Sequence, residues 1–328
     1  MANTTIPVSL VKKAWAKDTW ESGLSQSFFE KFTSTSPNSI IQLKEELKKE
    51  KGDSINIPLL MPLKGAGVTG DNMLEGNEEA MIYRDFSVTI DQIRNAVRLA
   101  GKFEEQKTQI NMRKDAKENL SRWLGEKIDR MIFEALTTSP SADRVIYGGS
   151  ANSEATVAAS DVFTAALIGK AKRLAQADEH TMIRPLRIDG RDTYVMIIDQ
   201  YQSRDLKADP VWLAAQQHAN IRGESNPIFT GALGMYDGVV IHECNRIPRT
   251  ATGASGAKVG HGLFLGCQAA VFAEGEAPFW EEELFDYKNQ VGFACGRICG
   301  IKKAEFKYDG SNFTDYGCIN VLTSSVDD

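Results

Sequence analysis

The residues with the most recognisable chemical spacing are three glycines in a short acidic stretch. Gly65, Gly67 and Gly70 lie in KGAGVTGDNMLEGNEEA at G-x-G-x-x-G spacing, which binds a dinucleotide when a buried strand precedes it and a helix follows it. The preceding SINIPLLMPL contains Pro58 and Pro62, and a proline removes a hydrogen-bond donor from a central strand. The segment after the glycines is acidic and would repel a phosphate. We therefore expect no nucleotide site here.

Two further motifs resemble metal sites. His242 and Glu243 begin like a zinc-protease helix, but Arg246 stands where the second histidine is needed. Cys295 and Cys299 have the spacing of helical metal ligands, but their segment has the composition of a strand, on which they would simply share a face. No second cysteine pair accompanies them. We expect structural side chains and no bound metal.

Two motifs resemble catalytic loops. Ser255 in GASGA misses the G-x-S-x-G nucleophile elbow by one residue, and no buried strand precedes it. Arg204, Asp205 and Leu206 resemble part of a kinase catalytic loop, but the other kinase motifs are missing. The sequence therefore predicts no catalytic residue, no metal ligand and no cofactor. The rival enzyme hypothesis is a nucleotide-dependent oxidoreductase that uses the glycines from Gly65 to Gly70.

The composition is that of a folded protein with one large or two medium cores. The chain has 328 residues, of which 42% are hydrophobic and 25% charged, and its formal net charge is −6. That charge gives no reason to expect tight binding to nucleic acid or to an anionic membrane. No uncharged apolar run of about 18 residues, and no signal peptide, is evident. The five cysteines are scattered through apolar runs, so we expect reduced, buried thiols.

The N-terminal third predicts an arm followed by a hairpin. Apolar residues recur at helical intervals between Val8 and Phe32, which indicates an amphipathic arm. Two extended segments, 54–63 and 81–101, flank the glycine-rich acidic stretch. They predict a protruding β-hairpin with that stretch at its tip.

The next segment predicts the longest helix of the chain, over 109–136, about 40 Å long at 1.5 Å per residue. Its apolar residues are spaced three and four apart, and Ser139 and Pro140 end it. The residues expected to form its buried face are Leu120, Trp123, Leu124, Ile128, Met131 and Ile132.

The remaining chain alternates helices and strands and then ends in long strands. We expect helices over 161–177 and within 201–218, a strand over 193–198, a turn at Asp237 and Gly238, and a mobile loop over 249–262. This order predicts an α+β fold with a discontinuous domain. Small residues alternate along 291–302, so we expect the long helix to approach that strand closely on the face of Gly292 and Gly296.

This order of elements, with the stretches KGDSINIPL, GVTGDNMLEGNEEA, TIDQIRNAVR and WLGEKIDRMIFEAL, resembles the major capsid proteins of tailed bacteriophages. The resemblance is to the branch typified by the podovirus N-four, with the Hong Kong ninety-seven type shell fold. It implies a virion protein, made and assembled in the host cytoplasm, whose hexamers and pentamers form an icosahedral shell around double-stranded DNA. An encapsulin-like bacterial compartment, which encloses cargo protein, is the alternative with the same fold.

The resemblance also implies a division of the chain and a set of partners. Residues 1–50 would be the N-terminal arm, 51–101 the extended hairpin loop, 102–145 with 270–328 the peripheral domain, and 146–269 the axial domain. The implied partners are other copies of the chain, a separate scaffolding protein, a portal and an optional decoration protein. Contact with packaged DNA would be weak and non-specific, and no membrane is involved.

The hairpin tip is the expected contact with a neighbouring subunit. Its charge is one-sided, with four acids and no base over 65–80, whereas 94–130 carries ten bases and six acids. We expect the tip to lie over the long-helix region of an adjacent subunit; a solvated acidic loop is the simpler alternative. A covalent cross-link through Lys64 is not expected. The residues of this predicted contact are Lys64, Gly65, Gly67, Gly70, Asp71, Glu75, Glu78 and Glu79.

Overall fold

The computed structural model describes residues 27–48, 52–61, 63, 65–107, 110–177, 181–188, 190–217, 233–307 and 313–327. The fold is α+β, as predicted, and the chain divides into two compact units. In the described part, the smaller unit consists of Ile93–Glu126 and Pro278–Arg297, and the larger unit contains the rest.

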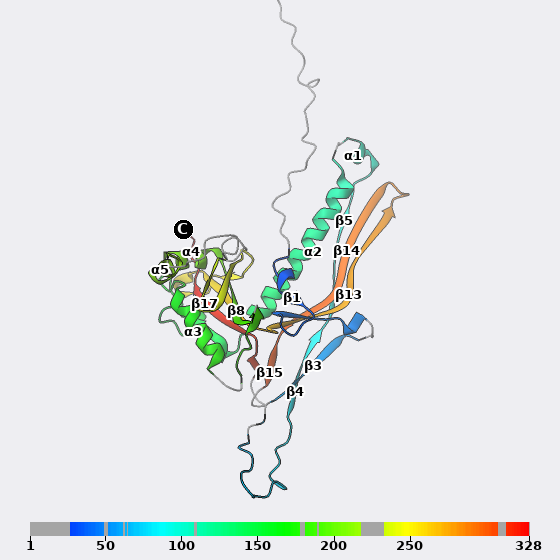
Figure 1. Ribbon diagram of the computed structural model, residues 1–328. Helices are drawn as coiled ribbons and strands as arrows, with labels where there is room; N and C mark the ends of the chain where they lie inside the picture. The colour runs from blue at the N-terminus through cyan, green and yellow to red at the C-terminus, as the bar shows by residue number, and fades with distance from the viewer. Residues whose placement is uncertain are drawn as a thin grey trace, which may run out of the picture. The chain divides into compact units, whose positions relative to one another are not determined.

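The larger unit is built on an eight-stranded sheet (Figure 1). Its main path runs in the order β6, β17, β12, β8, β10 and β9, while β11 pairs with β12 and β7 with β8. The strands are β6 (Val145–Tyr147), β7 (Leu186–Ile188), β8 (Arg191–Ile198), β9 (Gly234–Tyr236), β10 (Val239–Glu243), β11 (Arg249–Thr250), β12 (Val259–Leu265) and β17 (Cys318–Ser324). Every residue of β12 and β17 is buried, which is expected for central strands covered on both faces.

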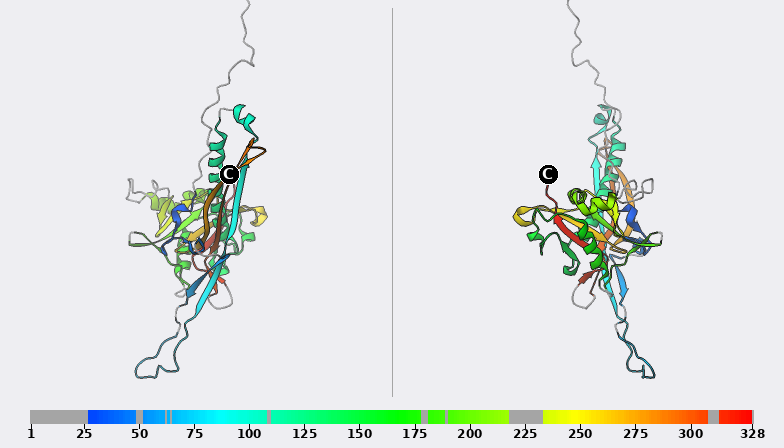
Figure 2. Two further views of the ribbon diagram at one scale, coloured as in Figure 1. Left: turned by 90° about the vertical axis from the view of Figure 1, so that its right-hand side faces the viewer. Right: turned by 60° about the vertical axis from the view of Figure 1, so that its left-hand side comes forward.

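Three helices, α3 (Ala165–Gln176), α4 (Gln200–Ala208) and α5 (Pro210–Gln217), lie beside this sheet (Figures 1 and 2). The side chain of Asp199 caps α4 by accepting a hydrogen bond from the backbone N–H of Gln202 at 2.6 Å. The core between helices and sheet contains Ile168, Tyr194 and Phe264, and the rings of the last two are 4.9 Å apart.

The predicted turn is confirmed, whereas the predicted loop is shorter than expected. Asp237 and Gly238 have positive φ angles of 50° and 76° and join β9 to β10. Of the segment 249–262, expected to be a mobile loop, residues 251–258 connect the strands, whereas 249–250 form β11, which pairs antiparallel with β12, and 259–262 form the first half of β12. A Cβ atom on Gly260 would lie 2.7 Å from Oδ2 of Asp199. Glycine is therefore present because of close packing inside a strand, not because of a turn.

The predicted long strands are β13 (Ala270–Phe285) and β14 (Gln290–Lys303). They are neighbours in a five-stranded sheet ordered β1, β2, β13, β14 and β5, in which the other strands are β1 (Thr33–Ser34), β2 (Ile41–Lys44) and β5 (Asp91–Arg98). In the larger unit β2 pairs in parallel with Ala270–Ala273 of β13. All five cysteines are free and buried, as predicted.

The predicted long helix is α2 (Met112–Thr137), which follows the short α1 (Lys102–Lys107). Among the residues expected on its buried face, the structure buries Leu120, Leu124 and Ile132, and half-buries Trp123, Ile128 and Met131.

The predicted packing of this helix on the small-residue face of β14 is wrong. The thiol of Cys295, on the opposite face, donates to the carbonyl oxygen of Leu120 at 3.5 Å, so that face meets α2. A Cβ on Gly296 would lie 2.8 Å from the carbonyl oxygen of Ile93 and would also meet the ring of Phe279. The small residues therefore make room for β5 and for an aromatic side chain of β13.

The predicted hairpin is confirmed. Strand β3 (Ser54–Leu60) pairs antiparallel with β4 (Tyr83–Thr89), in register from Ser54 with Thr89 to Leu60 with Tyr83. It protrudes from the larger unit in both figures. The second extended segment is not continuous, because the chain leaves the hairpin at Ile90 and enters β5 in a different sheet. A short hairpin of β15 (Glu305–Lys307) and β16 (Phe313–Asp315) completes the fold.

The predicted arm is described only in part. Residues 1–26 lie outside the described residues, and the last residues of the predicted helix form a turn and a 3₁₀ helix, Glu30–Phe32.

Candidate functional site: the hairpin tip

The hairpin tip, residues 61–82 with the flanking ends of β3 and β4, exposes an unusual amount of apolar surface. Seven large apolar side chains in this short stretch are 48 to 70% exposed. They are Leu60, Leu63, Met73, Leu74, Met81, Ile82 and Tyr83. So many exposed large apolar side chains on one protruding hairpin indicate a surface that another protein covers.

Hydrogen bonds and glycines shape the backbone of the tip. A carboxylate oxygen of Glu79 accepts from the backbone N–H of Gly65 at 2.6 Å, and Glu78 accepts from Gly76 at 2.7 Å. Gly67 and Gly70 both have a φ of 67°, the left-handed region that favours glycine. The predicted glycines and two of the predicted acids therefore shape the tip itself: Gly65 and Gly76 donate to carboxylates, and Gly67 and Gly70 supply left-handed backbone.

The other two predicted acids remain available to a partner. Asp71 and Glu75 are exposed and make no hydrogen bond or ion pair with any residue that the structure describes. Lys64 lies outside the described residues.

The base of the hairpin is anchored, unlike its tip. Phe86 and Val88 of β4 are buried together with Val271 of β13 and Phe306 of β15. The rings of Phe86 and Phe306 meet edge to face at 4.9 Å. This small core fixes the root of the hairpin, whereas the tip is held by its own hydrogen bonds.

The basic segment predicted to receive the tip keeps a surplus of positive charge after internal pairing. Three of its bases pair within the segment, namely Lys107 with Glu104 at 2.7 Å, Arg113 with Glu105 at 3.5 Å and Lys114 with Glu118 at 3.4 Å. The other seven bases form no ion pair with any described residue: Arg94, Arg98, Lys102, Lys117, Arg122, Lys127 and Arg130.

The apolar residues of the tip were not among the predicted contact residues. Their signal in the sequence is that ML and AMIY occur in a segment predicted to protrude far from any core. Apolar side chains in such a place cannot be buried by their own subunit. This pattern could have identified Met73, Leu74, Met81 and Ile82 from the sequence.

The motifs weighed for catalysis or metal binding lie in separate elements. His242 and Glu243 are in β10, and Cys295 and Cys299 are in β14, where burial raises the pKa of the Cys295 thiol. Over the described residues, no group of three or more histidine, cysteine, aspartate or glutamate side chains could hold a metal ion.

The remaining two motifs lie in a 3₁₀ turn and in α4. Ser255 lies in a 3₁₀ turn with a φ of 56°. Arg204 of α4 pairs with Asp205 at 3.0 Å and donates to the carbonyl oxygen of Val326 at 3.3 Å. In the part of the chain that is described, no helix has both the length and the apolar character needed to cross a membrane.

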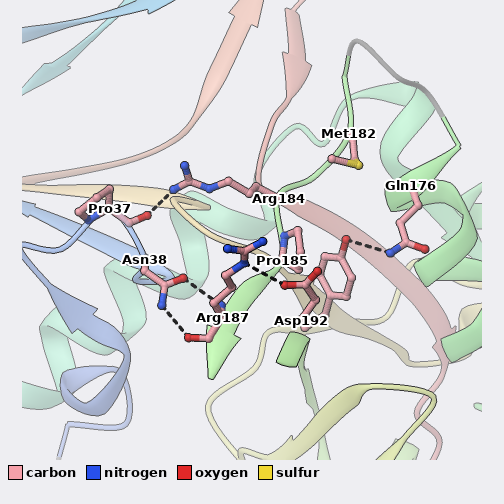
Figure 3. Close-up of a pocket in the computed structure, with 9 residues that line it drawn as sticks. Pro37, Asn38, Gln176, Met182, Arg184, Pro185, Arg187 and Asp192 are labelled. Atoms are coloured by element: carbon pink, nitrogen blue, oxygen red, sulfur yellow. Dashed lines mark hydrogen bonds and ion pairs between the residues drawn. The ribbon is translucent and has the colours of Figure 1, made fainter. Parts of the chain in front are cut away.

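A pocket of about 530 Å³ lies between the segment after β1 and strands β7 and β8 (Figure 3). The side-chain amide of Asn38 makes two hydrogen bonds with the backbone of Arg187, at 2.9 and 3.0 Å. Arg184 donates to the carbonyl oxygen of Pro37, and Arg187 meets Asp192 at 3.4 Å. Both guanidinium groups therefore already make contacts within the protein.

An α+β chain whose hairpin tip exposes large apolar side chains presents a surface suited to contact with another protein. Comparisons with known proteins identify the protein family. The model of the phage capsid protein family matches residues 3–327. The chain is 32% identical to the major capsid protein of Pseudomonas phage KPP25, over 96% of this chain and 95% of that protein.

Solved structures agree. The capsid of Ralstonia phage GP4 matches with a TM-score of 0.84 and 30% identity over 99% of both chains. The capsid asymmetric unit of cyanophage Pam1 matches with a TM-score of 0.86 and 27% identity over 100% of both chains. The chain belongs to the phage capsid protein family. It is a major capsid protein of a phage, with the tailed-phage capsid fold, and it associates with copies of itself to form the virion shell. The encapsulin alternative is not favoured.

Proposed function

We propose that this chain forms hexamers and pentamers that close an icosahedral shell around double-stranded DNA, and that it does so without catalysis. The uncovered apolar surface of the hairpin tip carries the proposal, because a single subunit cannot bury it. The chain would be made and assembled in the host cytoplasm, with a separate scaffolding protein, a portal, an optional decoration protein and only weak, non-specific contact with DNA. The proposed division is an arm (1–50), an extended loop (51–101), a peripheral domain (102–145 and 270–328) and an axial domain (146–269).

The tip contacts the long-helix region of an adjacent subunit. Its apolar side chains supply the buried area, while Asp71 and Glu75 meet bases that have no ion pair of their own, such as Arg122 and Arg130. Exposed ion pairs contribute only about 0 to 1 kcal/mol each, so the charges select the register and the apolar contacts supply most of the free energy.

Charge reversal at Asp71 and Glu75 tests the charged part of this contact. Both side chains are exposed and without partners in the described part of the chain, so lysine at both positions should leave the melting temperature unchanged. Shell yield, measured by sedimentation and electron microscopy, should fall most strongly at low salt, where charges are least screened. Normal yield at every ionic strength would refute the charged contact.

Glu78 and Glu79 provide the matched control. Because each accepts a backbone hydrogen bond within the tip, reversing them would also distort the hairpin. Glu78→Gln with Glu79→Gln keeps a hydrogen-bond acceptor at both positions and removes the two charges. It should therefore reduce the shell yield less than the reversals of Asp71 and Glu75 do. A larger loss from the glutamine variant would show that tip shape matters more than charge.

The N-terminal arm takes part in the same assembly. Deleting residues 1–26 should leave a chain that folds but closes shells poorly, because the deleted segment carries apolar residues such as Trp15 that need a covering surface. Normal shell closure by the truncated chain would show that the arm is dispensable.

The expectation that the chain binds no nucleotide cofactor has its own test. A ligand bound only by the folded protein raises its melting temperature. Titration with NAD, FAD and ATP should therefore leave the melting temperature unchanged. A saturable increase with any of them would favour the oxidoreductase hypothesis.

A further inference from the structure

One buried carboxylate holds the place where the N-terminal segment joins the described chain. Asp129, in the second half of α2, is 0% exposed. It accepts hydrogen bonds from the hydroxyl of Ser27 at 2.8 Å, from the backbone N–H of Phe28 at 2.7 Å and from that of Phe29 at 3.3 Å. Arg246, in the turn after β10, donates to the same carboxylate. A single side chain thus connects the arm root, residues 27–29, to α2 and to the turn after β10.

This connection controls the backbone direction of the arm root. The 3₁₀ helix Glu30–Phe32 begins without a side-chain cap of its own, so a residue about a hundred positions away satisfies the preceding N–H groups. Hydrogen bonds are directional, and two successive N–H groups that point at one carboxylate fix the orientation of their peptide groups. Bonds to a charged acceptor are also stronger than bonds between neutral groups.

The aromatic contacts of the arm root fix its position but not its direction. Phe29 is fully buried, and its ring meets that of Phe133 in α2 edge to face at 4.7 Å. The ammonium group of Lys31 lies over the rings of Phe28 and Phe32, at 4.7 and 4.9 Å from their centroids. These contacts involve side chains only, so they hold the position of the arm root without fixing the orientation of its peptide groups.

We propose that Asp129 is the positioning residue of the N-terminal arm. By orienting the peptide groups of Phe28 and Phe29, it fixes the backbone to which residues 1–26 are joined, and Arg246 holds the carboxylate in place. Shell closure depends on that fixed orientation. The proposal rests on the proposed part that the arm plays in assembly.

The test uses three variants of the full chain. Asp129→Asn combined with Arg246→Met removes the pair without leaving a buried, unpaired guanidinium group. Ser27→Ala removes only one hydrogen bond at the arm root. Lys303→Met combined with Asp315→Asn is the matched control, because it removes another buried ion pair, 3.0 Å long, that does not touch the arm root.

Two measurements distinguish positioning from simple stabilisation. Tryptic cleavage after Lys31 reports local release of the arm root. It should become about tenfold faster or more in the Asp129 variant, as expected for losing hydrogen bonds to a charged group, somewhat faster in Ser27→Ala, and unchanged in the control. Shell yield, compared at temperatures where the Asp129 variant and the control are equally folded, should fall several-fold more in the Asp129 variant.

Each outcome decides between the two roles. Equal shell yields for the Asp129 variant and the control at equal folded fraction, or unchanged cleavage after Lys31, would overturn the proposal and leave Asp129 with a structural role. Failure of the arm's proposed part in assembly is recognised separately, by normal shell closure in the chain that lacks residues 1–26. In that case cleavage after Lys31 still decides whether Asp129 orients the arm root.

Discussion

The hairpin tip and the eight-stranded sheet are both rich in apolar residues but bury them to opposite extents. In β12 and β17 every residue is buried, and two sheet neighbours satisfy their backbone groups. In the tip, seven large apolar side chains remain 48 to 70% exposed. The sheet is complete within one chain, whereas the tip becomes complete only in an assembly. The same substitution should therefore affect folding in one region and shell formation in the other.

The largest effect on folding is expected at Phe264 in β12, which is 0% exposed and packs against Tyr194. Phe264→Ala should lower the free energy of unfolding by about 3 to 5 kcal/mol because it leaves a cavity in the core. Denaturant titration of the unassembled chain measures this loss. A loss below about 1 kcal/mol would show that the sheet repacks easily and would remove the contrast with the tip.

Substituting one glycine in each region should give a smaller difference in the free energy of unfolding. Gly260→Ala should lower the free energy of unfolding by about 1 to 3 kcal/mol, because its Cβ would lie 2.7 Å from a carboxylate oxygen of Asp199. Gly67→Ala at the tip meets no atom within 4 Å and should cost only about 1 kcal/mol, from its positive φ. Thermal unfolding of both variants tests whether Gly260→Ala is the more destabilising change. A larger loss of stability in Gly67→Ala would contradict this expectation.

The sheet region also predicts acid sensitivity. His261 of β12 lies 3.5 Å from Glu154, and burial lowers its pKa below the ordinary 6.5. Burial alone would raise the pKa of Glu154, but hydrogen bonds from Thr250 and Thr252 and the nearby His261 bring it below its usual value of 4.5.

The sign of the pH effect is the same for both groups. Below pH 6.5 the unfolded chain binds a proton at His261 that the folded chain resists, so stability falls as the pH falls toward the folded pKa. The contribution of Glu154 is present above pH 4.5 and is lost as the pH falls through its own lowered pKa. Melting temperatures from pH 7 to 4 should therefore decrease, and less steeply in His261→Gln between pH 6.5 and 5. Equal slopes in both chains would place the acid sensitivity elsewhere.

The smallest effect on folding is expected at the tip. Leu74→Ser with Met81→Ser should change the free energy of unfolding by no more than about 0.5 kcal/mol, because both side chains are exposed. Shell formation, followed by sedimentation, should nevertheless be lost. Leu74→Met with Met81→Leu keeps the apolar surface and should assemble normally. Shells from the serine variant would mean that the tip is a solvated loop.

Elements with a strong local pattern were predictable from the sequence. The helix spacing from Leu120 to Ile132 predicts α2, and two extended segments around a glycine-rich tip predict the β3–β4 hairpin, because these periodicities depend only on neighbouring residues. The turn at Asp237 and Gly238 was predictable for the same reason. The resemblance to tailed-phage capsid proteins rested on these elements in their order.

Features that depend on distant residues were not predictable. Gly260 and its neighbours have the composition of a loop, and only the packing of β12 against Asp199 makes them strand residues. The small residues of β14 predict a close neighbour but do not say which, and the structure provides β5 in place of α2.

The sequence by itself therefore determined the element types, the hairpin with its acidic tip and the family resemblance, since local spacing and composition encode them. Only the tertiary structure decided which faces meet and which polar groups share a partner. Asp129 is the clearest case. In the sequence it is one polar residue of an amphipathic helix, but in the fold its carboxylate is buried against Arg246 and the arm root, 101 positions away from Phe28. Such a contact follows from how whole elements pack, and no local pattern carries it.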